Sequence, residues 1–209
     1  MSYSTGVRSN DNKPLNSSAQ GIAGAIFVGG KNSRMGGQTK ALLNWQGQRF
    51  IDYQVDYLTA AGCDPIYLVG QAEAVACWPA SVVFVQDSLP DYSGPLVALF
   101  SVLKKCQAPY LMTLPCDAVC LPDSLPQHFL DKIESHNAIY LKGQDAHYLI
   151  ALHKTALSAQ LNEKLASGLR SIKGWYADIQ ALPFIQHSAH ENNWNINTPE
   201  DYEALQHTL

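Results

Sequence analysis

The sequence predicts a three-layer α/β/α fold built on a mostly parallel sheet. Short apolar runs alternate along the chain with longer segments in which apolar residues recur at helical spacing. Strands that alternate with helices in this way usually form a parallel sheet covered by helices on both faces. Glycine and polar residues directly follow several of the apolar runs, as in folds whose ligands bind at the carboxyl ends of the strands.

Seven short segments are predicted as strands. The first, 22–28, is a continuous apolar run that leads into Gly29-Gly30, which is typical of a buried strand entering a tight loop. The expected strands cover residues 22–28, 66–69, 82–85, 110–114, 137–141, 148–152 and 179–185.

Six segments are predicted as helices. In 50–61 the apolar side chains follow helical spacing, and Gly62 supplies a stop. Segment 95–106 begins with proline and ends with lysines, which suits the first turn and the dipole of a helix. The expected helices cover residues 50–61, 95–106, 123–135, 155–166, 169–177 and 199–207.

Length and composition favour one domain. The 209 residues are 46% hydrophobic, which suffices for a sizeable core. We expect a flexible N-terminal tail over 1–21, which is polar and rich in Ser and Asn, and a single domain over 22–209. The net charge of -4 argues against a nucleic-acid partner, and the absence of an apolar run of about 18 residues argues against a membrane span.

The five cysteines predict reduced thiols. Their number is odd and their spacing irregular, and the first twenty residues lack the basic start and apolar middle of a secretory signal. Because disulfides are rare in the cytosol, we expect a cytoplasmic protein.

A glycine-rich segment, 29–40, follows the first predicted strand. Its four glycines allow the backbone to approach a ligand closely, and its N–H groups could surround phosphate oxygens. Arg34 and Lys40 add cations suited to phosphate, although residue types alone fit a surface loop with two solvated cations equally well. Neither the P-loop pattern nor the dinucleotide fingerprint is present.

Two aspartates, Asp87 and Asp117, also come directly after predicted strands. Because the carboxyl ends of parallel strands meet at one edge of a sheet, both should lie near the glycine-rich segment. Taken alone, each aspartate could instead begin a turn or a helix. Their shared position favours a ligand site.

The segment 27–40 resembles L-A-G-G-x-S-x-R-M-G-x-D-K, the signature that opens the molybdenum cofactor guanylyltransferases, the MobA family of the nucleotidyltransferase superfamily. Further matches occur in the order and spacing of that family, and the resemblance covers about residues 22–207. They are Asp87-Ser-Leu, Gly94-Pro-Leu96, Pro115-Cys-Asp117 and Asn195-Ile-Asn-Thr-Pro-Glu200. The resemblance implies a nucleotide-diphospho-sugar-transferase-like (Rossmann-like) fold.

The implied activity is Mg²⁺-dependent transfer of GMP from GTP to the terminal phosphate of molybdopterin, with release of pyrophosphate. Lys40 and Arg34 would neutralise the triphosphate, and Asp117 would bind Mg²⁺. The nucleotide and acceptor contacts that the resemblance implies lie at Phe27, Val28, Gly29, Gly30, Lys40, Val69, Asp87, Asp117, Asn195 and Asn197. The family also implies partners among proteins that deliver the cofactor and proteins that mature molybdoenzymes.

Two alternatives to this activity remain at the level of sequence. Thr39 and Asn32 stand where the family has Asp and Ser, which would suit a degenerate protein that binds nucleotide or cofactor without transferring anything. The cytidylyltransferase of the same cofactor pathway is the nearest enzymatic alternative. Relatives that use guanine read Ala-Gly-Gly in the first motif and those that use cytosine read Ala-Ala-Gly, so Val28-Gly29-Gly30 favours guanine.

Overall fold

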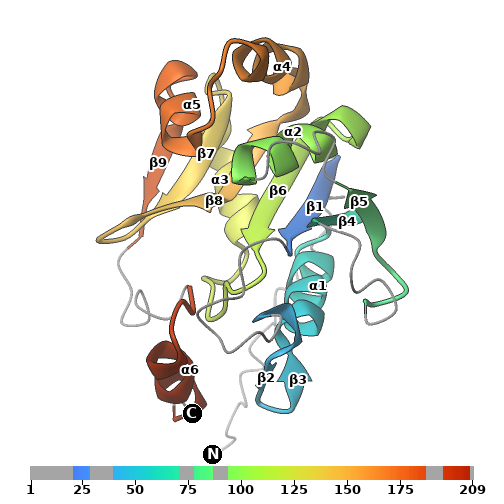
Figure 1. Cartoon of the computed structure of the whole chain (residues 1–209), viewed down its shortest axis with the longest axis vertical. Coiled ribbons are helices and arrows are strands. Elements are labelled where there is room, and N and C mark those ends of the chain that lie inside the picture. The colour runs from blue at the N-terminus through green and yellow to red at the C-terminus, as the bar shows by residue number, and fades with distance from the viewer. Residues whose placement is uncertain (1–20, 29–39, 71–77, 87–93, 187–194, 208–209) are drawn as a thin grey trace, which may run out of the picture.

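A seven-stranded sheet forms the centre of the protein (Figure 1). The computed structural model describes residues 21–28, 40–70, 78–86, 94–186 and 195–207. Along the sheet the strands are ordered β5-β4-β1-β6-β8-β7-β9. Their bounds are β1 (Ile22–Phe27), β4 (Ile66–Gly70), β5 (Val83–Gln86), β6 (Tyr110–Pro115), β7 (Ala138–Lys142), β8 (Ala146–Lys154) and β9 (Leu182–Ile185).

Helices cover both faces of the sheet, which confirms the three-layer prediction. Helices α1 and α3 pack on one face, and α2, α4 and α5 pack on the other. The helices are α1 (Phe50–Ala60), α2 (Pro95–Lys105), α3 (Leu125–Ile133), α4 (Ser158–Ala166), α5 (Ile172–Asp178) and α6 (Pro199–Gln206), with short 3₁₀ turns η2 (Lys40–Leu42) and η4 (Thr155–Leu157).

The sheet is parallel except at β8, which runs antiparallel to both of its neighbours, β6 and β7. This strand begins two residues before the predicted segment 148–152 and ends two residues after it. The predicted segments 123–135, 169–177 and 179–185 correspond to the shorter or shifted elements α3, α5 and β9. Strand direction has no signature in residue type, so the reversal at β8 was not predictable from apolar runs.

A two-stranded ribbon before α1 was missed at the level of sequence. It consists of β2 (Asn44–Trp45) and β3 (Gln48–Arg49). The turn between them has φ of 51° at Gln46 and 81° at Gly47, which is the left-handed pair of a tight hairpin. Two-residue strands are too short to show a periodic pattern.

Leu58 of helix α1 packs closely on Gly24 of the central strand β1. A Cβ atom placed on Gly24 would be 2.9 Å from Cδ1 of Leu58, which is fully buried on α1. The absence of a side chain at Gly24 therefore leaves room for Leu58 to pack directly on the strand.

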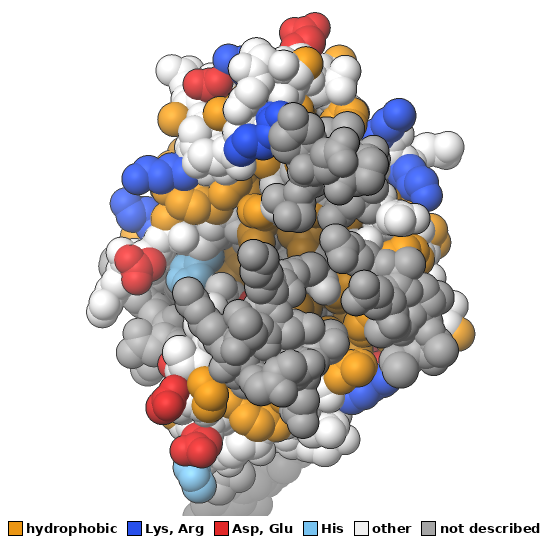
Figure 2. Space-filling model, viewed as in Figure 1, with side chains coloured by type: hydrophobic (Ala, Val, Ile, Leu, Met, Phe, Trp, Pro, Cys, Tyr) orange, Lys and Arg blue, Asp and Glu red, His pale blue; other side chains and the backbone are white. Residues whose placement is uncertain are grey.

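Charged side chains are dispersed over the surface. On the face in Figure 2, Lys and Arg side chains of the described residues are scattered and form no continuous basic stripe. None of the four cysteines that the structure describes forms a disulfide, and none of its described helices is long and apolar enough to cross a membrane.

His153, on β8, is a buried polar residue in the core. The hydroxyl of Tyr176 donates to the Tyr148 carbonyl (2.8 Å), and that of Thr113 donates to the Leu149 carbonyl (2.9 Å). Because both hydroxyl protons are thus engaged, Nε2 of His153 is the donor in its 3.1 Å contact with the Tyr176 oxygen. Nδ1 has no hydrogen-bond partner among the described residues. Burial lowers the pKa of His153 from 6.5 to about 3.

This lowered pKa predicts a specific loss of stability in acid. The unfolded chain binds a proton at His153 below about pH 6.5 whereas the native protein does not, so stability is complete above that pH and falls as pH decreases toward 3. From pH 7.5 to pH 5.0, the unfolding free energy of the wild type should fall by about 2 kcal/mol more than that of His153→Gln. Urea unfolding at both pH values measures this difference, and equal losses would contradict the assignment.

Candidate active site

The carboxyl ends of three neighbouring strands define the candidate site. Phe27 at the end of β1 pairs with Val69 of β4 on one side and with Pro115 of β6 on the other. After β1 the chain adds β4 and β5 on one side, then crosses to add β6 on the other. Ligands of open α/β sheets bind at such a switch point, which here lies between β1 and β6.

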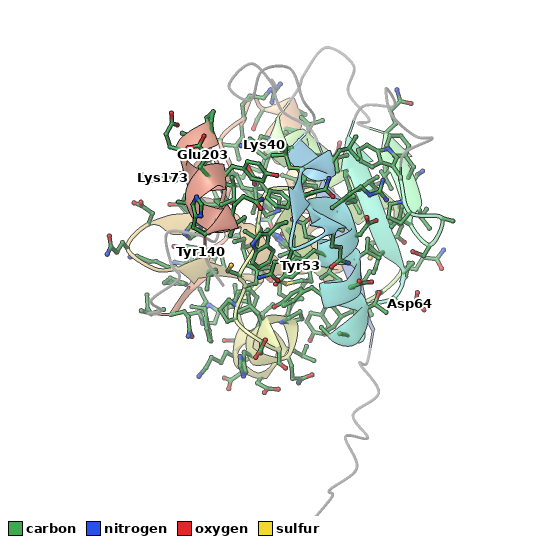
Figure 3. All side chains as sticks on the ribbon, turned by 90° about the horizontal axis from the view of Figure 1, so that it is seen from below. Lys40, Tyr53, Asp64, Tyr140, Lys173 and Glu203 are labelled. Atoms are coloured by element: carbon green, nitrogen blue, oxygen red, sulfur yellow. The ribbon has the colours of Figure 1, made fainter. Side chains whose placement is uncertain are left out.

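The Lys40 side chain occupies this edge. Its Nζ lies 2.8 Å from Oδ2 of Asp117 and 2.8 Å from the carbonyl oxygen of Ile196. The side chains of Lys40 and Asp117 are only 20% and 12% exposed, so water screens their ion pair weakly. In the view of Figure 3, Lys40 projects toward the end of the chain near Glu203 of α6, in line with its bond to Ile196 before this helix. The structure thus brings together two site residues predicted from distant segments.

The turn that carries Asp117 is held by hydrogen bonds from several elements. The turn closes through Ala118 N–H to the Pro115 carbonyl (3.1 Å), and Cys116 N–H donates to the Phe27 carbonyl (3.0 Å). Burial raises the pKa of the Cys116 thiol to about 12, so this group adds no charge beside Asp117 at neutral pH.

Gln54 also contacts this turn, and the sequence analysis missed it. Its side chain extends from α1 and donates to the Pro115 and Ala118 carbonyls. The available signal was a polar residue within the apolar stripe formed by Ile51, Val55 and Leu58.

The segment Asn195-Ile-Asn-Thr-Pro-Glu200 reaches the site by its backbone. Ile196 N–H donates to the Asp117 carbonyl (3.0 Å), while the Ile196 side chain is fully buried. Thr198 begins α6 in a capping box with Asp201, whose carboxylate accepts the N–H of Asn197 (2.9 Å). Part of this motif therefore starts a helix. Asn195 is half-buried and Asn197 exposed.

Phe27, Val28 and Val69 lie at the predicted edge, but their backbones are already engaged within the sheet. Val28 N–H donates to the Val69 carbonyl (2.8 Å), and the Phe27 carbonyl accepts the N–H of Cys116. The Val69 side chain is fully buried.

Several predicted site residues lie outside the described residues, so their predicted roles remain predictions. They are Gly29, Gly30, Arg34 and Asp87, together with the two departures from the family pattern, Asn32 and Thr39.

The donor atoms at this edge suit a hard cation. The Asp117 carboxylate and the Ile196 carbonyl already hold one positive group, the Lys40 ammonium. Oxygen donors of these two kinds are the ligands that Mg²⁺ prefers, completed by water and substrate phosphates. No group of three or more His, Cys, Asp or Glu side chains able to hold a metal occurs within the described ranges. A cation here would therefore depend on oxygens from substrate, water or other segments.

The Lys40–Asp117 pair should contribute more to stability than a surface pair. Lys40→Ala removes the ammonium that pairs with the weakly hydrated Asp117 carboxylate and should lower the unfolding free energy by about 1.5–3 kcal/mol. Lys164→Ala is the matched control, because Lys164 pairs with Asp178 at 2.7 Å with both side chains 41% exposed. Its loss should be below about 1 kcal/mol. Denaturant unfolding of both variants tests the ranking, and equal losses would refute it.

Comparison with known proteins identifies the family. The model of the MobA-like NTP transferase domain matches residues 24–180. The chain is 32% identical over 190 residues to a molybdenum cofactor guanylyltransferase of Shewanella frigidimarina, spanning 88% of this chain and 95% of that protein. It is 34% identical over 169 residues to one of Bordetella petrii, spanning 75% and 83%.

The fold agrees with this assignment. The crystal structure of molybdopterin-guanine dinucleotide biosynthesis protein A from Archaeoglobus fulgidus superposes with a TM-score of 0.70 at 17% identity, over 88% of this chain and 96% of that chain. The predicted nucleotide-diphospho-sugar-transferase-like fold is therefore confirmed. From the extent of the domain match and the identity to both relatives, the chain belongs to the MobA-like NTP transferase domain family.

Proposed function

We propose that this protein is a molybdenum cofactor guanylyltransferase, which transfers GMP from GTP to the terminal phosphate of molybdopterin and releases pyrophosphate. One structural observation carries the proposal: a lysine and an aspartate from loops after β1 and β6 meet at the switch point of the sheet. The names of the relatives support the choice of reaction.

The proposed reaction is an in-line displacement. An oxygen of the acceptor phosphate attacks the α-phosphorus of GTP, a new P–O–P bond forms, and the bond to pyrophosphate breaks. The attacking oxygen is already anionic, so the chain needs no general base. The protein contributes position and charge neutralisation.

Lys40 provides charge from a preset position. Its backbone starts η2, and the neighbouring Ala41 is fully buried, so the base of the side chain is fixed. We propose that the ammonium leaves Asp117 when nucleotide binds and moves to the triphosphate, where negative charge accumulates as pyrophosphate departs. Arg34 would share this task.

Asp117 is the proposed ligand of Mg²⁺, with Asn195 or Asn197 on the metal or acceptor side. Bound Mg²⁺ would stabilise negative charge on the phosphate oxygens. Gly29 and Gly30 would leave room for the guanine base, and Phe27, Val28, Val69 and Asp87 would line the nucleoside part. These roles are those that the family resemblance implies.

We also propose that the reaction takes place in the cytoplasm. The four described cysteines are free, which fits a reducing cytoplasm. Proteins that deliver the cofactor or mature molybdoenzymes would be its further partners.

Base choice is the first test of this function. GTP should exceed ATP, CTP and UTP in kcat/KM by at least about tenfold, the ratio that 1.4 kcal/mol of discrimination provides. Pyrophosphate release is followed for each nucleotide with Mg²⁺ and molybdopterin-loaded acceptor. Preference for CTP would identify a cytidylyltransferase, and GTP binding without pyrophosphate release would identify a binding protein.

The second test concerns Asp117. Asp117→Asn keeps the size of the side chain but removes its charge, so turnover should fall by about 10²–10³-fold. Asp178→Asn is a matched control, since it removes an ion-paired aspartate on α5, outside the proposed site. Circular dichroism verifies that both variants fold. Wild-type turnover in Asp117→Asn would show that this carboxylate serves the turn alone.

A further inference from the structure

We propose that Gln54 is a positioning residue for Asp117: its buried amide fixes the turn from which the carboxylate reaches the metal. This inference rests on the proposed function for the role of Asp117. Its geometric part depends only on contacts within the protein.

The Gln54 amide bridges the first and last residues of the turn. Nε2 donates to the Pro115 carbonyl at 2.8 Å and to the Ala118 carbonyl at 2.9 Å. The same turn closes through the 3.1 Å bond from Ala118 N–H to Pro115. Asp117 is the third of the four turn residues, so its Cα position is determined by this closure.

Only an amide satisfies this position well. Two carbonyl oxygens face one nitrogen, and an NH₂ group supplies the two protons that they need. An ammonium group would bring a net charge to a side chain that is fully buried, and an apolar side chain would bring no donor.

Burial of the Gln54 side chain costs free energy that apolar packing alone would not require. Oε1 of Gln54 is buried and has no hydrogen-bond partner among the described residues. Leucine or methionine would fill the same stripe of α1 without this unsatisfied atom. The gain that offsets it lies in the two bonds to the Asp117 turn.

The turn is also held by two other parts of the protein, and Gln54 adds a third contact from α1. Strand β1 holds Cys116 through the Phe27 carbonyl, and the segment before α6 holds the Asp117 carbonyl through Ile196 N–H. Gln54 supplies the support from α1. A second α1 residue, Tyr57, donates to the Pro122 carbonyl (2.7 Å) further along the same loop.

Loss of the amide should therefore weaken metal binding at Asp117 more than it weakens nucleotide binding. Partners that orient a metal ligand typically change metal affinity or activity by 10–100-fold when removed. We expect Gln54→Met to raise the dissociation constant of Mn²⁺ by about tenfold, and the Mg²⁺ concentration for half-maximal turnover by a similar factor. GTP affinity measured without metal should stay within about twofold.

The experiment uses the full chain and Mn²⁺ as probe, since carboxylate and water suit Mn²⁺ as they do Mg²⁺. Electron paramagnetic resonance reports free Mn²⁺ in titrations without turnover. Leu58→Ala is the matched control, because it removes a fully buried side chain one helical turn away on α1 that packs against β1. It should destabilise the protein and leave Mn²⁺ affinity within about twofold of the wild type.

Each outcome decides the proposal. Unchanged Mn²⁺ affinity in Gln54→Met, or an equal loss in Leu58→Ala, overturns it. If Gln54→Met does not fold, Gln54→Asn replaces it; its shorter amide cannot span both carbonyls, and unchanged affinity there overturns the proposal too. A wild-type protein that binds Mn²⁺ but transfers no nucleotide refutes the proposed function alone, and one that binds no Mn²⁺ either with or without GTP refutes both.

Discussion

The contact of Lys40 with Asp117 and Ile196 is the interaction on which the candidate site depends. Lys40 is 77 positions from Asp117 and 156 from Ile196 in the sequence, so the contact links the end of the glycine-rich segment, the turn after β6 and the segment before α6. A partly buried carboxylate needs a nearby cation, and a partly buried ammonium needs oxygen partners. Each segment therefore stabilises the placement of the other two.

Packing holds this contact in place. A small apolar cluster beneath it combines Leu43, Phe50, Val119, Ile196 and Leu205. Tyr202 of α6 donates to the Asn44 carbonyl in the ribbon, which attaches the last helix to the ribbon before α1. Since long-range charge pairs alone specify position poorly, the apolar cluster determines where the charges meet.

The sequence predicted the strands and helices because apolar runs and helical spacing reflect burial directly. It predicted that Asp117 and the glycine-rich segment share an edge, because parallel strands place their carboxyl ends together. It did not predict the partners of Lys40, since one of them is a backbone carbonyl whose role has no residue signature. The role of Gln54 was not predicted for a related reason. A single polar residue in an apolar stripe can be assigned a role only when the backbone carbonyls that it contacts are known.

Gly24 has a consequence well beyond its own strand. Because Gly24 lacks a side chain, Leu58 of α1 packs directly on β1, and Gln54 one turn earlier on the same helix reaches the turn after the adjacent strand. A methyl group at this position would first meet Cδ1 of Leu58, so this fully buried side chain would have to repack. A residue that touches no ligand thus shapes the packing of the helix that carries Gln54.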